Sequence, residues 1–183
     1  MMRNLKLLAE HNKGTRTLKQ SILVPEILAA IQAWCYYVNN GTLIGGLAYS
    51  YYSKPRTTQD IDLLFLHSGE IPHEVQGFKK IRPHCFEHKK TGVEVEVLDP
   101  NTIKMEPKLA KWINDASIVD TSLGHPVRIA SPSGIVASKL GRWSFQDRSD
   151  VDHLLNDFDI DVSNAPLSKV NKLKFTKFRL FRR

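Results

Sequence analysis

The chain has 183 residues, 42% of them hydrophobic and 25% charged, which is the balance of a globular protein that can bury a core. No apolar run is long enough for a secretory signal or a membrane span, so we expect a soluble, cytoplasmic protein without membrane contact. Cys35 and Cys85 lack the spacing of a metal site, and we expect two reduced thiols.

Hydrophobic periodicity predicts strands that alternate with helices, followed by a helical part that begins near residue 131. Pro25 suits a first helical turn, and Val93–Val97 alternates apolar and acidic residues as a strand does. Ser68–Pro83 shows no clear element. The predicted elements are a helix from Pro25, a strand Thr42–Ile44, a helix Leu47–Ser53, strands Ile61–Leu66 and Val93–Val97, a helix Ile103–Ile113, a strand Pro126–Ala130, a helix Ser131–Trp143 and a helix Asp150–Asp157.

This order of elements predicts the α/β (α+β) class, with a mixed sheet flanked by helices and a small helical C-terminal part. We divide the chain into an N-terminal arm (1–24), a core (25–130), a helical C-terminal part (131–160) and a basic tail (161–183).

Two aspartates one residue apart stand inside an apolar strand. Side chains two residues apart in a strand share a face, so Asp60 and Asp62 project together. Glu94 or Glu96 can join them from a neighbouring strand, and alternation puts both glutamates on one face. Three converging carboxylates suit Mg²⁺ or Mn²⁺. We therefore predict a site for two such ions, of the kind that activates an attacking oxygen and stabilises a leaving one.

Gly45-Gly46 lies between a predicted strand and a predicted helix. Backbone N–H groups and the dipole at a helix N-terminus favour phosphate, and the absence of side chains lets it come close. A metal site and a phosphate cradle together indicate a nucleoside triphosphate site. Each motif is weak alone, because a glycine pair is usually a turn and D-x-D also occurs in glycosyltransferases.

In this order, Gly45-Gly46, Asp60-Ile61-Asp62 and a later acidic strand residue resemble the DNA polymerase β-like nucleotidyltransferase superfamily. The segment from Arg56 to Asp62 is similar to the R-x-[ST]-x-D-I-D form of its small bacterial members, including the AbiEii-type toxin nucleotidyltransferases. Ser133–Leu155, with Lys139, Arg142, Arg148 and Asp150, resembles their helical segment more loosely. The resemblance covers about residues 25–157.

The resemblance implies transfer of a nucleoside monophosphate from an NTP to a hydroxyl acceptor, with release of pyrophosphate. It implies that Asp60 and Asp62 bind both metal ions and that a third carboxylate helps to hold one of them. Glu96 precedes two apolar residues and fits the third position better than Glu94, although the family more often has aspartate there.

The resemblance also places Gly45 and Gly46 along the triphosphate and Lys139 against phosphate charge. Arg56 and Thr58, in the same motif, are candidate nucleotide contacts, and a structural pairing of Arg56 with Asp60 or a carbonyl is equally compatible with the sequence.

Within the basic tail, residues 166–183 have a charge equal to the whole net charge of +7, because they contain seven Lys and Arg and no Asp or Glu. Phe175, Phe178 and Phe181 recur among these charges at steps of three. Base stacking and phosphate attraction would explain this pattern, which makes RNA a candidate partner. A docked C-terminus whose phenylalanines cover a groove explains it equally well.

Several residues near these motifs have ordinary structural explanations. Tyr49, Tyr51 and Tyr52 could stack a base or accept a nucleotide, but filling the core is the simpler explanation. Arg148 and Asp150 are expected to form a salt bridge, and the histidines lack zinc-site spacing.

The sequence thus favours an Mg²⁺-dependent nucleotidyltransferase that acts on RNA such as tRNA or on protein, in a toxin–antitoxin setting with an antitoxin partner. The alternative is a non-catalytic nucleotide- or RNA-binding module of the same fold. A D-x-D glycosyltransferase ranks third, because Gly45-Gly46 and the short chain do not suit it.

Overall fold

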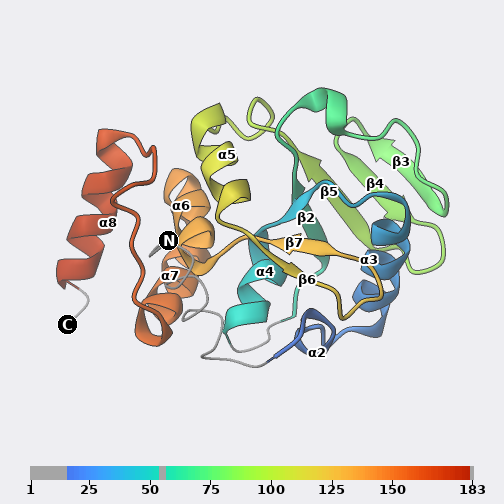
Figure 1. Cartoon of the computed structure of the whole chain (residues 1–183), viewed down its shortest axis with the longest axis horizontal. Coiled ribbons are helices and arrows are strands. Elements are labelled where there is room, and N and C mark those ends of the chain that lie inside the picture. Colours follow the sequence, from blue (N-terminus) through green and yellow to red (C-terminus); the bar gives the residue numbers. More distant parts are fainter. Residues whose placement is uncertain (1–15, 54–56, 182–183) are drawn as a thin grey trace.

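A mixed seven-stranded β-sheet flanked by helices forms the centre of the protein, as the sequence predicts (Figure 1). The computed structural model describes residues 16–53 and 57–181. The sheet has the order β3-β4-β5-β2-β1-β7-β6. Its strands are β1 (Thr42–Leu43), β2 (Asp60–Leu64), β3 (Phe78–Arg82), β4 (Cys85–His88), β5 (Glu94–Leu98), β6 (Ile118–Asp120) and β7 (Val127–Ile129).

Helices cover the sheet and continue beyond it into the C-terminal part (Figure 1). None of those in the described segments is long and apolar enough to cross a bilayer. They are α2 (Leu18–Ser21), α3 (Pro25–Tyr37), α4 (Gly45–Tyr52), α5 (Pro107–Asp115), α6 (Pro132–Arg142), α7 (Phe145–Asp157) and α8 (Lys169–Phe181), with a short 3₁₀ helix, η1, at Ser68–Glu70.

The caps explain where the C-terminal helices begin. Ser131 accepts a hydrogen bond from the Gly134 N–H at 3.2 Å, and Pro132 takes the first helical position of α6. Helix α7 begins at Phe145, ahead of the predicted Asp150, because Ser144 and Asp147 form a reciprocal capping box. The first residue of each helix is therefore set by capping residues that are close to it in the sequence.

The segment after β5 corrects one prediction. A helix was expected from Ile103, whereas α5 begins at Pro107. The buried Asp99 carboxylate accepts hydrogen bonds from the Thr102 N–H at 2.9 Å and from its hydroxyl at 3.1 Å, which fixes a turn in place of a first helical turn.

The central strands set the register of the acidic residues. Strands β2 and β5 are parallel, and Asp60 lies opposite Glu94 while Asp62 lies opposite Glu96. On the other side of β2, β1 pairs antiparallel with it and parallel with β7. Hairpin β3–β4 joins the sheet through antiparallel pairing of β4 with β5, in a region where the sequence showed no element.

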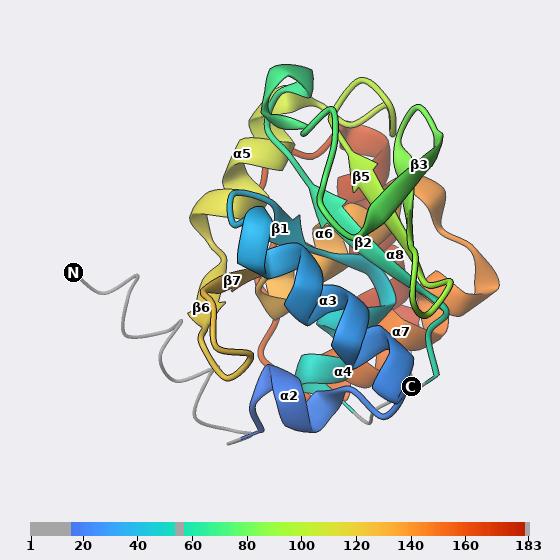
Figure 2. The ribbon, with the colours of Figure 1, turned by 90° about the vertical axis from the view of Figure 1, so that its right-hand side faces the viewer.

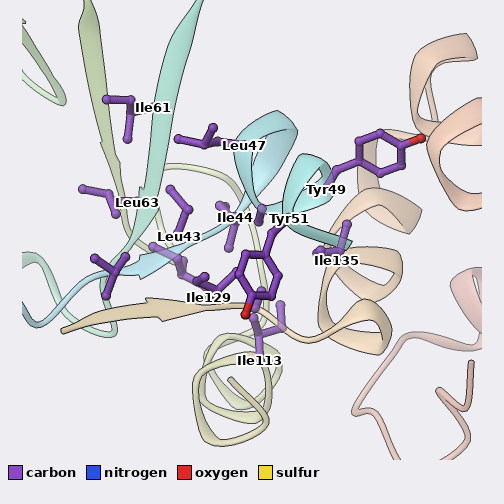
Figure 3. Close-up of a cluster of buried hydrophobic side chains, with 14 of the residues drawn as sticks. Leu43, Ile44, Leu47, Tyr49, Tyr51, Ile61, Leu63, Ile113, Ile129 and Ile135 are labelled. Carbon is purple, nitrogen blue, oxygen red and sulfur yellow. The ribbon is translucent and has the colours of Figure 1, made fainter. Parts of the chain in front are cut away.

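The apolar core lies on the sheet face opposite these carboxylates. Ile61 and Val95, which alternate with the acidic residues, are both fully buried. Helix α3 lies across the sheet (Figure 2), and its Trp34 packs edge-on against Phe86 of β4 with ring centroids 5.3 Å apart. Figure 3 shows part of this core, in which Leu47 of α4 and Ile135 of α6 join Ile61.

The C-terminal segment holds helix α8, which packs on α6 (Figure 1). Its docked face includes Phe175, which is buried, and Phe178, whose ring lies 5.2 Å from that of Trp143. The Lys174 ammonium donates to the Leu140 carbonyl at 3.3 Å. Phe181, in contrast, is 80% exposed. Two of the three phenylalanines therefore cover a groove on the body of the protein.

Candidate functional site

Strands β2 and β5 carry an acidic strip along one face of the sheet. Asp60 and Asp62 are partly buried in β2, and Glu94 and Glu96 are partly buried beside them in β5. In-register pairing in a parallel ladder brings opposite residues side by side on the same face. The structure therefore brings Asp60, Asp62 and both glutamates together, as period-two alternation predicts.

The Asp62 side chain lies against the first residue of α4. Gly45 has a φ of 65°, which glycine adopts readily and other residues rarely do. A Cβ atom added to Gly45 would stand 1.8 Å from Asp62 Oδ2. The Ile44 N–H also donates to the Asp62 carbonyl at 3.0 Å. Gly45 is thus needed both for its backbone conformation and for the room that the carboxylate takes. Gly46, the next residue of α4, is buried.

Burial, together with the neighbouring charges of Asp60 and Glu96, raises the pKa of Asp62 to about 7. Arg142 and Lys139 oppose this rise. A carboxylate held so close to others gains from a cation that neutralises the cluster. Asp62 is therefore the residue at which a bound cation would change the charge balance most.

The two candidate glutamates have different surroundings. Glu94 forms an ion pair with Arg82, and the Cys85 thiol donates to its Oε2 at 3.3 Å. Glu96 instead contributes to the raised pKa of Asp62. The side chain of Glu94 is thus engaged at the outer part of the strip, while Glu96 stands next to Asp62 in register.

The motif that precedes β2 is described from Thr57 onward, so Arg56 lies outside the described residues. The Thr58 hydroxyl donates to Asp60 Oδ1 at 2.9 Å. In this structure, the contact made by Thr58 orients the carboxylate of Asp60.

Lys139 lies in a buried ionic network between α6 and α7. Only 6% of it is exposed, and its ammonium lies 2.7 Å from Asp150 Oδ2 and 3.1 Å from Asp147 Oδ1. Arg142 donates from Nε and Nη2 to the two oxygens of Asp147, at 2.8 Å each. The charge of Lys139 is thus matched by two carboxylates, and Asp150 forms an ion pair with Lys139.

Burial alone would raise the pKa of Asp147, but hydrogen bonds from Arg142 and Ser144 and the charge of Lys139 lower it well below its usual value. Asp147 is fully buried and stays ionised at neutral pH. The network therefore holds α6 and α7 together as an ionic core next to the acidic strip.

A cleft of about 630 Å³ opens between the acidic strip and the helical C-terminal part. That volume is within the usual range for small-molecule sites. Among the residues that line it, the sequence did not single out Lys104, Ser138 or Asn171. They come from three separate segments, so only the fold brings them together. The lining of the cleft also includes Gly45, Asp62, Leu98, Met105, Leu109, Lys139, Arg142, Asp147 and Ser168.

The tyrosines of α4 contribute to the core. Tyr49 and Tyr51 are 3% and 5% exposed. The Tyr49 hydroxyl lies 2.9 Å from His153 Nδ1, while burial and the nearby Asp120 raise the pKa of Tyr51 to about 12. Core packing therefore accounts for both side chains.

The acidic strip offers oxygen donors to a metal ion. No group of three His, Cys, Asp or Glu side chains is already arranged around one point within residues 16–53 and 57–181. The chemistry of the set nevertheless suits a hard divalent cation, because Asp60, Asp62 and Glu96 offer only oxygen donors. Because Gly45 has no Cβ, it does not compete with the Asp62 carboxylate for space. These residues fit Mg²⁺ or Mn²⁺.

The contact between Gly45 and Asp62 supports a stability prediction. We expect Gly45→Ala to destabilise the protein by about 1–2 kcal/mol through its left-handed φ and by roughly 2 kcal/mol more through the clash with Asp62. Gly92 has a similar φ of 74° with no atom near an added Cβ, so Gly92→Ala measures the first effect alone. Urea unfolding of both variants gives the difference, and equal losses would contradict the clash.

Comparison with known proteins gives one informative result. No family model matches the sequence, and no curated protein matches it. Among solved structures, the fold is similar to that of an antigenic nucleotidyltransferase-like protein from Paracoccidioides brasiliensis. The TM-score is 0.57 with 18% sequence identity, and the match covers 92% of this chain and 89% of that one. At this identity the likeness establishes a nucleotidyltransferase-like fold.

Proposed function

We propose that the protein is an Mg²⁺-dependent nucleotidyltransferase that moves a nucleoside monophosphate from an NTP to a hydroxyl acceptor and releases pyrophosphate. One observation carries the proposal: Asp60, Asp62 and Glu96 lie side by side on paired strands, with Asp62 against Gly45 at the wall of a cleft. The likeness in fold to a nucleotidyltransferase-like protein supports the same class.

In this mechanism Asp60 and Asp62 hold two Mg²⁺ or Mn²⁺ ions and Glu96 completes the set. When bound, such ions supply positive charge to the phosphate that reacts and to the oxygen that leaves. Thr58 keeps Asp60 in one orientation through its 2.9 Å hydrogen bond. Glu94, the alternate third ligand, is the weaker candidate because Arg82 already binds it.

Gly45 and Gly46 bind the triphosphate through their backbone in this proposal, since they begin α4 next to Asp62. Lys139 lines the same cleft, but Asp147 and Asp150 neutralise its ammonium. We therefore assign Lys139 to positioning: it holds the α6–α7 wall of the cleft beside the phosphates. The role of Arg56 as a nucleotide contact stays a prediction from the sequence motif.

The acceptor that best matches the surface chemistry is RNA. Helix α8 presents Lys169, Lys172, Lys177 and Arg179 along a segment without acidic residues, and its first turn borders the cleft through Asn171. A basic surface that leads to the reaction site would attract a polyanionic acceptor. A protein hydroxyl, a toxin role and an antitoxin partner rest on the sequence resemblance alone.

A non-catalytic nucleotide-binding module is the second candidate. Two observations favour it: Lys139 is already neutralised, and the carboxylates of the described segments are not prearranged around one point. Such a module would bind an NTP without releasing pyrophosphate, and its binding would be indifferent to the loss of Asp62.

The test uses the purified full chain with Mg²⁺ or Mn²⁺, the four α-labelled NTPs and total bacterial RNA. Asp62→Asn is the paired variant, and Asp115→Asn, on the exposed face of α5, is the matched carboxylate control. We expect label on RNA, or on the protein itself, with the wild type and Asp115→Asn only. NTP binding without transfer in any sample would favour the binding module, and neither binding nor transfer would overturn both functions.

A further inference from the structure

Among the described residues, three cationic side chains line the cleft, and two of them already have carboxylate partners. Lys139 pairs with Asp147 and Asp150, and Arg142 donates two hydrogen bonds to Asp147. Lys104 is exposed and makes no side-chain hydrogen bond or ion pair with another residue in the part of the chain that the structure describes. A polyanion that enters the cleft can therefore pair with Lys104 without displacing a carboxylate.

The backbone that carries Lys104 is fixed by a network of turn hydrogen bonds. Asp99 accepts from Thr102, as described above, and its carbonyl accepts from the Ile103 N–H at 3.2 Å. The Lys104 N–H donates to the Asn101 carbonyl at 3.3 Å, and the Met105 N–H donates to the Pro100 carbonyl at 2.8 Å. This turn directly follows β5, so the position of Lys104 is tied to the strand that carries Glu96.

Lys104 also has an uncommon backbone conformation. Its φ is 51°, in the left-handed region that glycine, asparagine and aspartate tolerate better than lysine. The turn keeps a long cationic side chain at a position where glycine would fold without strain. Backbone strain of this kind is concentrated at binding and catalytic sites.

We propose that Lys104 binds the phosphates of the incoming nucleoside triphosphate from the wall of the cleft formed by the turn after β5. The proposal rests on the proposed function and adds a phosphate-binding residue to it. In this arrangement Lys104 supplies the unpaired positive charge that Lys139 does not, because Asp147 and Asp150 already neutralise the Lys139 ammonium. The ligand class is a triphosphate, either free or as part of an NTP.

The experiment measures binding of ATP and of inorganic tripolyphosphate by calorimetry, with Mg²⁺ and with EDTA. The variants are Lys104→Gln, Lys104→Arg and Lys104→Gly, of which the last also relieves the strained φ. Lys108→Gln is the matched control, because Lys108 is exposed in the first turn of α5 and does not line the cleft. Thermal unfolding of each variant checks that the variant is folded.

We expect Lys104→Gln and Lys104→Gly to weaken binding of both ligands about tenfold, with Lys104→Arg within twofold of the wild type and Lys108→Gln unchanged. Wild-type affinity in Lys104→Gln would overturn the proposal while leaving the nucleotidyltransferase function intact. A wild type that binds neither ligand and transfers no label would overturn the proposed function itself. An equal loss in Lys108→Gln would show that only net charge matters and would also overturn the role of Lys104.

Discussion

Asp62→Asn is expected to abolish nucleotidyl transfer and, without metal, to raise the stability of the protein at pH 8 by up to roughly 4 kcal/mol. Burial, Asp60 and Glu96 raise the pKa of Asp62 to about 7 in the folded protein, from 3.8. The unfolded chain therefore loses this proton first as the pH rises. The free energy of unfolding falls between about pH 4 and pH 7 on account of this group, and the full cost is present above pH 7.

Chemical unfolding in EDTA from about pH 2.5 to pH 8 tests this expectation. The effect of the substitution should be smallest below about pH 3, where Asp62 is protonated in both the folded and the unfolded state, and should grow as the pH rises through about 4 toward 7. Added Mg²⁺ should stabilise the wild type and not the variant, because a ligand that binds only the folded state shifts the equilibrium toward it.

Glu94→Gln is the control on the same sheet face. It removes the exposed ion pair with Arg82 and should leave the pH dependence unchanged, with a loss of at most about 1 kcal/mol. A metal-free Asp62→Asn protein that is less stable than the wild type at pH 8 would contradict the assignment of Asp62 to the strained acidic cluster.

The second large effect is expected at Asp147, whose carboxylate joins α6 to α7. Asp147→Asn leaves the buried Lys139 with one carboxylate partner and weakens the Arg142 pair, so we expect a loss of about 3–5 kcal/mol at pH 7. Because the pKa of Asp147 is lowered in the folded state, its contribution is full above about pH 4 and declines only as the pH falls below that value.

Urea unfolding at pH 7 and in the acid range measures both parts of this prediction. Asp115→Asn breaks an exposed i,i+4 pair with Lys111 and should cost no more than about 0.5 kcal/mol. A loss at Asp147 no larger than this control would mean that the network adds nothing to the α6–α7 contact. A difference that disappears already at pH 5 would contradict the low pKa.

The acidic strip could be predicted from the sequence because it depends on local alternation. Asp60 and Asp62 in β2, and Glu94 and Glu96 in β5, keep a period of two between buried residues, so the shared face follows once the strands are identified. Alternation alone could not distinguish the two glutamates, and the preference for Glu96 came from the family resemblance. Their surroundings differ because Arg82 reaches Glu94 from a hairpin whose polar, short strands carry little periodic signal.

The ion-pair partners of Lys139 could not be predicted from the sequence either. Its neighbours Ile135–Leu140 show that one face of α6 is apolar, but its partner Asp147 belongs to the next helix and points inward because of the turn at Trp143. Helix α8 is a similar case. The spacing of Phe175 and Phe178 fits a helix face as well as a stacking surface, and only the groove beside Trp143 decides between them.

The pairing order of the sheet has a consequence for the time at which the protein acquires its site. Strand β1 pairs with β7, and β2 pairs with β5 only after the chain has passed through the β3–β4 hairpin. During synthesis β1 and β2 can pair with each other first, but their other partners, β7 and β5, are made later, and such distant pairings close slowly. The cleft needs α6 and α8 as well. A ribosome-bound chain would therefore carry both glycines and both aspartates long before its cleft is complete.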